Sequence, residues 1–211
     1  VHWINYCSVC DKYTTELIKP FNHVYIENVC EKCGLDDGWD YSLSDSEITI
    51  TGYTGEHKDV VIPSSIENLP VVAIAGNTFK NNTLIESVVI PNNIKTIGGS
   101  AFYGCSSLKE VSIGNGVVEI GISAFDSCTS LGNVVIPNSV TSIGKYAFYG
   151  CTALESITIP FVGGTAEANR HFGYIFGASK YSQNAEYVPT SLKYLTISEG
   201  CTSIYEHAFD G

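Results

Sequence analysis

Apolar and polar residues recur along this chain with a period of 23 residues. Segments 107–113, 130–136 and 153–159 share their second, fifth and seventh positions as apolar residues, and each starts 23 residues after the one before. Within each segment apolar and polar side chains alternate, which predicts a short half-buried strand. A fixed period of this length is typical of proteins built from stacked repeats.

Each repeat also carries the same core and corner residues. Val117 and Ile120 predict a second short inward-facing segment. Proline follows the first strand and ends it, because proline cannot donate to a strand ladder, and an Ile-Gly step predicts a tight corner. The recurring residues are Phe79, Phe102, Phe125 and Phe148; Ile90, Ile113, Ile136 and Ile159; Pro91, Pro137 and Pro160; Gly98, Gly121 and Gly144; and Cys105, Cys128 and Cys151.

We expect the phenylalanines to fill the wide end of each coil. One coil cannot bury its apolar residues alone, so neighbouring coils must stack, with strands about 4.8 Å apart. Cys105, Cys128 and Cys151 would then lie one above another. Their parallel side chains disfavour disulfide geometry, and we expect them to be buried free thiols.

The pattern L-x-x-I-x-I-P-x-x-V-x-x-I-G-x-x-A-F-x-x-C resembles the BspA-like leucine-rich repeats of bacterial surface proteins. The resemblance covers residues 60–211, with three consecutive near-perfect copies. It implies a β-rich solenoid, a right-handed leucine-rich-repeat superhelix of short parallel strands with few or no long helices. It also implies a secreted or cell-surface module that attaches to host matrix proteins or to other microbes.

The two ends of the predicted solenoid, residues 60–211, are less regular. Asn82 stands at the cysteine position of the first coil, where a small polar group would bond the corner backbone. In the last coil Cys201 replaces a core valine, so we expect it to be buried. Ahead of the solenoid we assign residues 39–59 to a β-hairpin cap, because 47–55 alternates around a glycine turn. The cap would cover the open edge of the first coil.

An insertion at 161–190 interrupts the period. Ile159 and Ile197 lie 38 residues apart, which is 15 more than one repeat. Insertions in solenoids leave from one face, often the binding face. Its aromatic residues either pack the loop onto the solenoid or contact a ligand. The candidate ligand contacts are Phe161, His171, Tyr174, Tyr181 and Tyr187, together with Tyr103 and Tyr149, which share one repeat position.

The exposed positions of the first strand form the other candidate contact face. This face is polar and of mixed charge, and a merely solvated surface is the competing interpretation. The positions are Glu86, Ser87 and Val89; Lys109, Glu110 and Ser112; Gly132, Asn133 and Val135; Glu155, Ser156 and Thr158; and Lys193, Tyr194 and Thr196. Among them we select Lys109, Glu110, Lys193 and Tyr194 as candidate partner contacts.

Residues 1–38 do not follow the repeat and contain two C-x-x-C pairs. Cys7 and Cys10 are separated by 19 residues from Cys30 and Cys33. Two such turns can complete a tetrahedral four-thiolate site, and this spacing is that of a zinc ribbon. We therefore expect a structural zinc that staples a short element, with His23 as an alternative ligand. Disulfides and free thiols remain the alternatives.

Composition narrows the function. The net charge of −11 argues against nucleic acid and anionic lipid as partners. No stretch has the 18 or so apolar residues that span a bilayer, so we expect no direct membrane insertion. The chain has no Met. We therefore expect Val1 not to be a natural start and the chain to be a fragment that lacks its export signal and anchor.

No catalytic motif is recognisable in the sequence. We therefore expect a non-catalytic module, secreted or on the cell surface, that binds a protein or glycan on a host or microbial surface. A structural spacer that presents another domain is the first alternative. A metal- or thiol-dependent enzyme at the N-terminal cysteines is the remote one.

Overall fold

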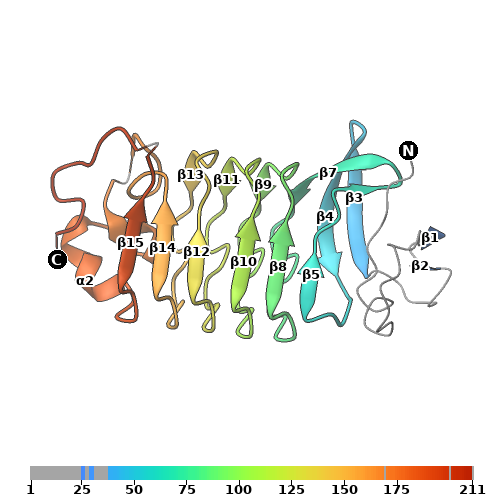
Figure 1. The fold of residues 1–211 in the computed structure, drawn as a ribbon, viewed down its shortest axis with the longest axis horizontal. Coiled ribbons are helices and arrows are strands. Elements are labelled where there is room, and N and C mark those ends of the chain that lie inside the picture. Colours follow the sequence, from blue (N-terminus) through green and yellow to red (C-terminus); the bar gives the residue numbers. More distant parts are fainter. Residues whose placement is uncertain (1–24, 27–28, 31–37, 169, 200, 211) are drawn as a thin grey trace, which may run out of the picture.

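The chain folds as a rod of stacked coils (Figure 1). The structure, a computed structural model, describes residues 25–26, 29–30, 38–168, 170–199 and 201–210. The first strand of each coil joins one six-stranded sheet in which every pairing is parallel. Its strands are β5 (Asp59–Val61), β8 (Ser87–Ile90), β10 (Glu110–Ile113), β12 (Asn133–Val135), β14 (Ser156–Ile159) and β15 (Tyr194–Ile197).

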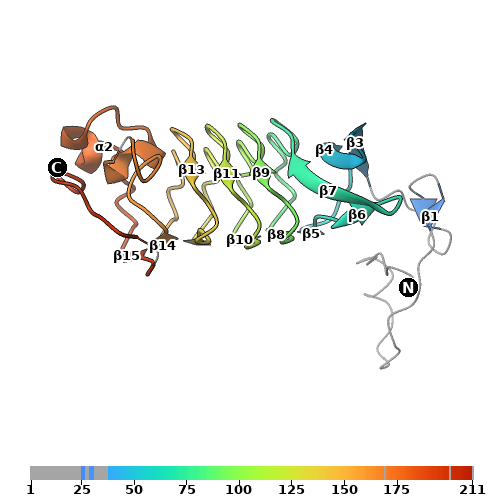
Figure 2. The same ribbon diagram turned by 90° about the horizontal axis from the view of Figure 1, so that it is seen from above.

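The second strand of each coil joins a seven-stranded sheet on the other side of the rod (Figure 2). The predicted second inward segments are therefore confirmed, and the chain is a parallel β-solenoid. The sheet contains β3 (Trp39–Ser44), β4 (Glu47–Tyr53), β6 (Ser65–Ile66), β7 (Leu69–Ile74), β9 (Thr96–Ile97), β11 (Glu119–Ile120) and β13 (Ser142–Ile143). A separate antiparallel pair consists of β1 (Tyr25–Ile26) and β2 (Val29–Cys30).

A column of phenylalanine rings runs through the interior. Phe79 and Phe102 stack at 4.7 Å between ring centroids, and Phe102 and Phe125 at 5.0 Å. Phe125 and Phe148 follow at 5.4 Å, with their ring planes within 3° of parallel. All four rings are fully buried. The repeat thus places one large apolar side chain per coil, and stacking the coils removes both ring faces from water.

The corner glycines allow neighbouring coils to approach closely. A Cβ added at Gly121 would lie 2.5 Å from the backbone nitrogen of Gly99 and 2.8 Å from the carbonyl carbon of Gly98, in the preceding coil. Gly98 and Gly144 face their preceding coils in the same way. The predicted corner is therefore present. The corner position requires glycine because the backbone of the preceding coil leaves no room for a Cβ.

The cysteines form the predicted ladder of free thiols. The Cys105 Sγ donates to the carbonyl of Phe79 at 3.1 Å, and Cys128 donates to Phe102 at 3.1 Å. At the same position in the first coil, Asn82 Oδ1 accepts a hydrogen bond from the backbone N–H of Leu84 at 3.0 Å. The predicted bond from Asn82 to the corner backbone is therefore confirmed. Burial raises the pKa of the Cys105 thiol to about 12, so at neutral pH it is protonated and inert.

The cap is a hairpin, but its turn is not where the sequence placed it. Residues 47–53 form the single strand β4, which pairs with β3, and the reversal occurs at Asp45 and Ser46. Both turn residues have positive φ, 50° and 65°, as a tight two-residue hairpin turn requires. β4 then pairs in parallel with β7. Trp39 and Tyr53 contact the Phe79 ring at the end of the phenylalanine column.

The insertion packs at the C-terminal end of the rod (Figure 2). It forms the 3-10 helices η1 (Phe172–Phe176) and η2 (Tyr181–Gln183) and the short helix α2 (Asn184–Tyr187). The buried Asn184 accepts the Gly173 N–H at 2.8 Å and donates to the carbonyl of Ala208 at 3.2 Å. It therefore ties the insertion to the last coil. No helix in the described part of the chain is long and apolar enough to cross a membrane.

Candidate functional site

The outer face of the six-stranded sheet aligns one side chain per coil in straight rows. Val61 pairs with Val89, Val89 with Ser112, and Val135 with Thr158. Val61 is 56% exposed and Val135 is 62% exposed. Short side chains in register, all but Ser112 β-branched, make this central row flat, with apolar groups open to solvent. The full row is Val61, Val89, Ser112, Val135, Thr158 and Thr196.

A polar row lies two residues earlier on the same strands. Ser87 Oγ donates to Asp59 Oδ1 at 2.7 Å, and Ser156 Oγ donates to Asn133 Oδ1 at 2.7 Å. These bonds join neighbouring coils and hold the side chains in fixed positions. The row ends at Tyr194, which is 67% exposed. We call the central row and this polar row together the sheet face.

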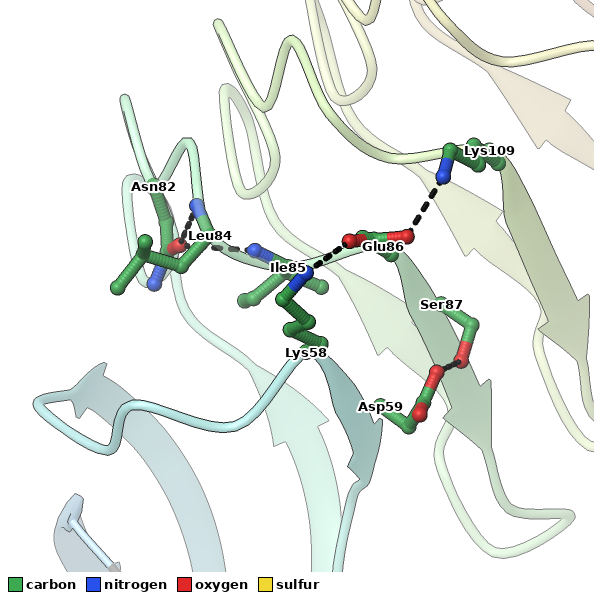
Figure 3. Close-up of polar contacts among 8 residues, drawn as sticks. All are labelled: Lys58, Asp59, Asn82, Leu84, Ile85, Glu86, Ser87 and Lys109. Atoms are coloured by element: carbon green, nitrogen blue, oxygen red, sulfur yellow. Dashed lines mark hydrogen bonds and ion pairs between the residues drawn. The ribbon is translucent and has the colours of Figure 1, made fainter.

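A ladder of alternating charge borders the sheet face (Figure 3). Lys58 Nζ and Lys109 Nζ each lie 2.6 Å from a different carboxylate oxygen of Glu86. Further along, Lys193 Nζ lies 2.9 Å from Glu155. Hydrogen bonds and charge from Lys109 and then Lys58 lower the pKa of Glu86 to about 2. Exposed pairs of this kind add little stability, but they order the border of the sheet face.

Gly132 is the one uncharged position within this ladder between Lys58 and Lys193. It stands between Lys109 and Glu155, and an added Cβ would meet no atom within 4 Å. A charged residue of either sign at 132 would face one neighbour of the same sign, which costs energy. A glycine avoids that repulsion and leaves a notch at the middle of the border.

We expect Glu86→Gln to lower the melting temperature slightly at pH 7, with an effect that disappears in acid. The folded pKa of Glu86 lies below the ordinary 4.5, so its contribution is full above about pH 4.5 and is lost as the pH falls toward about 2. Melting curves from pH 7 to 2 test this, with Glu119→Gln on the opposite sheet as the control. A difference between wild type and Glu86→Gln that does not change with pH would contradict the assignment.

The structure brings some of the candidate contacts together and separates others. Lys109 and Glu110 lie with Lys193 and Tyr194 on or beside the sheet face, all exposed. Lys58, Asp59 and Val61 complete that surface and were missed, because the longer first coil puts Lys58 28 residues before Glu86. Aligning the sequence by its 23-residue period therefore does not place Lys58 beside Glu86.

The other candidates lie in the insertion or at the solenoid corner. Phe161 is 7% exposed and packs in the core, so it offers little surface to a partner. His171 is half-buried, and desolvation lowers its pKa. Tyr174 and Tyr187 are half-buried, whereas Tyr181 is exposed and stacks on His207 at 4.7 Å. Tyr103 and Tyr149 lie on the corner, with Lys80 over the Tyr103 ring.

Cys201 is half-buried, so the expectation of a fully buried thiol was wrong. It lines a cavity of about 160 Å³ together with Phe161 and Tyr205. The sulfur donates to the carbonyl of Ser203, two residues on, instead of joining the ladder. No Asp, Glu, His, Lys or Arg side chain lines the cavity.

The predicted zinc ligands Cys7, Cys10 and Cys33, and His23, lie outside the described residues. Cys30 belongs to β2, but its side chain is not described. The zinc site therefore stays a prediction. In the part of the chain that the structure describes, no three His, Cys, Asp or Glu side chains are grouped to hold a metal ion.

Known proteins share this architecture. A family model described as "BspA type Leucine rich repeat region" matches residues 72–169 with six copies. Two solved bacterial leucine-rich repeat proteins match over more than half of the chain. The T. pallidum protein is 29% identical over 75% of this chain and 79% of that protein, with a TM-score of 0.54. The Bacteroides capillosus protein is 26% identical over 58% of this chain and 94% of that protein, with a TM-score of 0.53.

A leucine-rich cell surface protein from Faecalibacterium prausnitzii has 33% identity over 84% of this chain, with a TM-score of 0.60. The chain spans 45% of the length of that protein. No curated protein sequence matches the chain.

Proposed function

Since residues 72–169 form a BspA-type leucine-rich-repeat region, we propose that the chain is a non-catalytic cell-surface module that binds proteins through its sheet face. The observation that supports this most strongly is the central row, in which exposed valines lie beside a row of ordered polar groups. Val135, near its middle, is 62% exposed. Exposed apolar side chains bordered by polar and charged groups are the arrangement found at protein interfaces.

The shape of the sheet face favours an extended partner. Its rows run along the rod axis with one side chain per coil, so contacts to a partner would be spread over six strands. The alternating charge ladder would align such a partner and set its direction, since rim charges act on association rate and specificity. Host matrix proteins and surface proteins of other microbes are elongated molecules, and we propose them as the partners.

The same comparison supports a cell-surface location. The F. prausnitzii relative is described as a cell surface protein. A protein-binding solenoid displayed outside the cell would reach host or microbial partners directly, and we place the chain there.

A binding experiment with immobilised fibronectin, laminin and type IV collagen tests the function. We expect wild type to bind at least one of them with a dissociation constant of about 1–10 μM, equivalent to roughly −8 to −7 kcal/mol. Val135→Arg puts a long charged side chain on the apolar centre and should weaken binding by about tenfold or more. Binding that survives Val135→Arg unchanged would place the contact elsewhere.

Val118→Arg is the matched control. Val118 is 41% exposed and lies beside β11 on the opposite sheet, so the same substitution there leaves the sheet face intact. Equal losses in the two variants would indicate a general charge effect. Absence of binding by wild type to all three proteins would favour the second candidate, a spacer. The elongated regular stack suits that role, because it could project another domain from the envelope (Figure 1).

A further inference from the structure

One corner of the solenoid carries a tyrosine in a backbone conformation that does not suit it. Asn77, Ser100, Ser123, Tyr146 and His207 share the repeat position before the Ala/Thr-Phe pair, and all five have a positive φ between 55° and 64°. Small or polar residues tolerate this left-handed conformation at low cost, whereas a bulky side chain is strained there. Tyr146 is the one tyrosine among the five, and strain of this kind is often found at ligand sites.

The ring of Tyr146 belongs to a cluster of three tyrosines. Tyr146 meets Tyr149 edge to face, with 5.7 Å between ring centroids, and Tyr149 lies 6.5 Å from Tyr187 of α2. A Cβ at Gly177 would lie 2.5 Å from the Tyr146 ring, so the insertion provides a glycine where the ring needs room. The corner and the insertion, far apart in sequence, thus jointly hold the cluster.

A lysine and a serine lie beside the cluster. Lys145 Nζ lies 4.9 Å from the centre of the Tyr146 ring and 2.7 Å from Ser179 Oγ. Tyr149 is 45% exposed. Within the described residues, none of the three phenol hydroxyls has a hydrogen-bond partner in the protein, which leaves them free to bond a ligand.

This combination fits a sugar. A pyranose ring with equatorial hydroxyls has an apolar C–H face, which packs on an aromatic ring, and a hydroxyl edge, which needs donors and acceptors. The chain's net charge of −11 disfavours an acidic sugar. We propose that Tyr146, Tyr149 and Tyr187, with Lys145, form a binding platform for a neutral β-linked pyranose oligosaccharide.

The platform lies at the corner beside the insertion, away from the sheet face, so it does not depend on the proposed protein binding. The probes are cellohexaose and hexa-N-acetylchitohexaose, measured by saturation-transfer NMR and titration. We expect at least one to bind wild type with a dissociation constant of about 1 mM. Tyr149→Ala, which removes the most exposed ring, should weaken this by about tenfold.

Tyr146→Asn is a second variant that should keep the fold, because Asn77 occupies the same repeat position with the same φ of 64°. This variant should melt at or above the wild-type temperature while losing sugar affinity about tenfold. Tyr181→Ala and Val135→Arg should bind as wild type, which separates this site from the exposed Tyr181 and from the sheet face. No binding of either probe up to roughly 10 mM, or binding unchanged in Tyr149→Ala and Tyr146→Asn, would overturn the proposal and leave the cluster as packing only.

Discussion

Phe125→Ala is expected to lower the free energy of unfolding by about 3–5 kcal/mol. The Phe125 ring is fully buried and stacks on Phe102 at 5.0 Å and on Phe148 at 5.4 Å. Its removal loses the burial of the ring itself and leaves a cavity between two coils that cannot close, because the strands on both sides are fixed by their ladders. Urea titration followed by circular dichroism measures the change.

Ile122→Ala is the control for that measurement. Ile122 lies in the same coil but is 63% exposed, so its truncation should change the free energy of unfolding by less than about 0.5 kcal/mol. A Phe125→Ala loss below about 1 kcal/mol would mean that the ring column is not the core of the solenoid.

Gly121→Ala is expected to destabilise the chain by about 2–3 kcal/mol although it adds a single methyl group. The new Cβ would lie 2.5 Å from the backbone nitrogen of Gly99, and backbone atoms cannot rotate away as a side-chain end can. The two coils would have to separate at this corner, which weakens their ladder bonds and the ring contact beside them. The same urea titration measures the loss.

Gly132→Ala provides a chemically identical control. A Cβ there meets nothing within 4 Å, so the free energy of unfolding should stay constant or rise by about 0.5 kcal/mol, since alanine restricts the unfolded chain. Similar effects at positions 121 and 132 would show that coil contact is not what requires glycine at 121.

The repeat period predicted the parts of the fold that depend on one residue per coil. Phe102, Phe125 and Phe148 had to stack once the period was recognised, and the cysteine ladder followed for the same reason. The Asp45–Ser46 turn was missed although residues 39–44 alternate apolar and polar side chains. The turn was assigned to the glycines within 47–55, whereas the pair at 45–46 contains no glycine.

The candidate site was predictable only in outline. Exposed strand positions follow from alternation, so Lys109, Glu110 and Tyr194 were placed correctly on one surface. The ion pair between Lys58 and Glu86 was not predictable, because the longer first coil breaks the period. Tyr146 was also missed, since its left-handed backbone and its contact with Gly177 arise only when the insertion folds back onto the corner.

Hydroxyl-radical footprinting of the chain, free and bound to a matrix protein, tests most directly whether the sheet face is the binding surface. The method reports side-chain exposure residue by residue. We predict that oxidation of Val135 and Tyr194 falls several-fold in the complex, while that of Val118 and Ile122 on the opposite side of the rod is unchanged. Protection of Val118 and Ile122, with Val135 and Tyr194 still oxidised as in the free chain, would contradict the account.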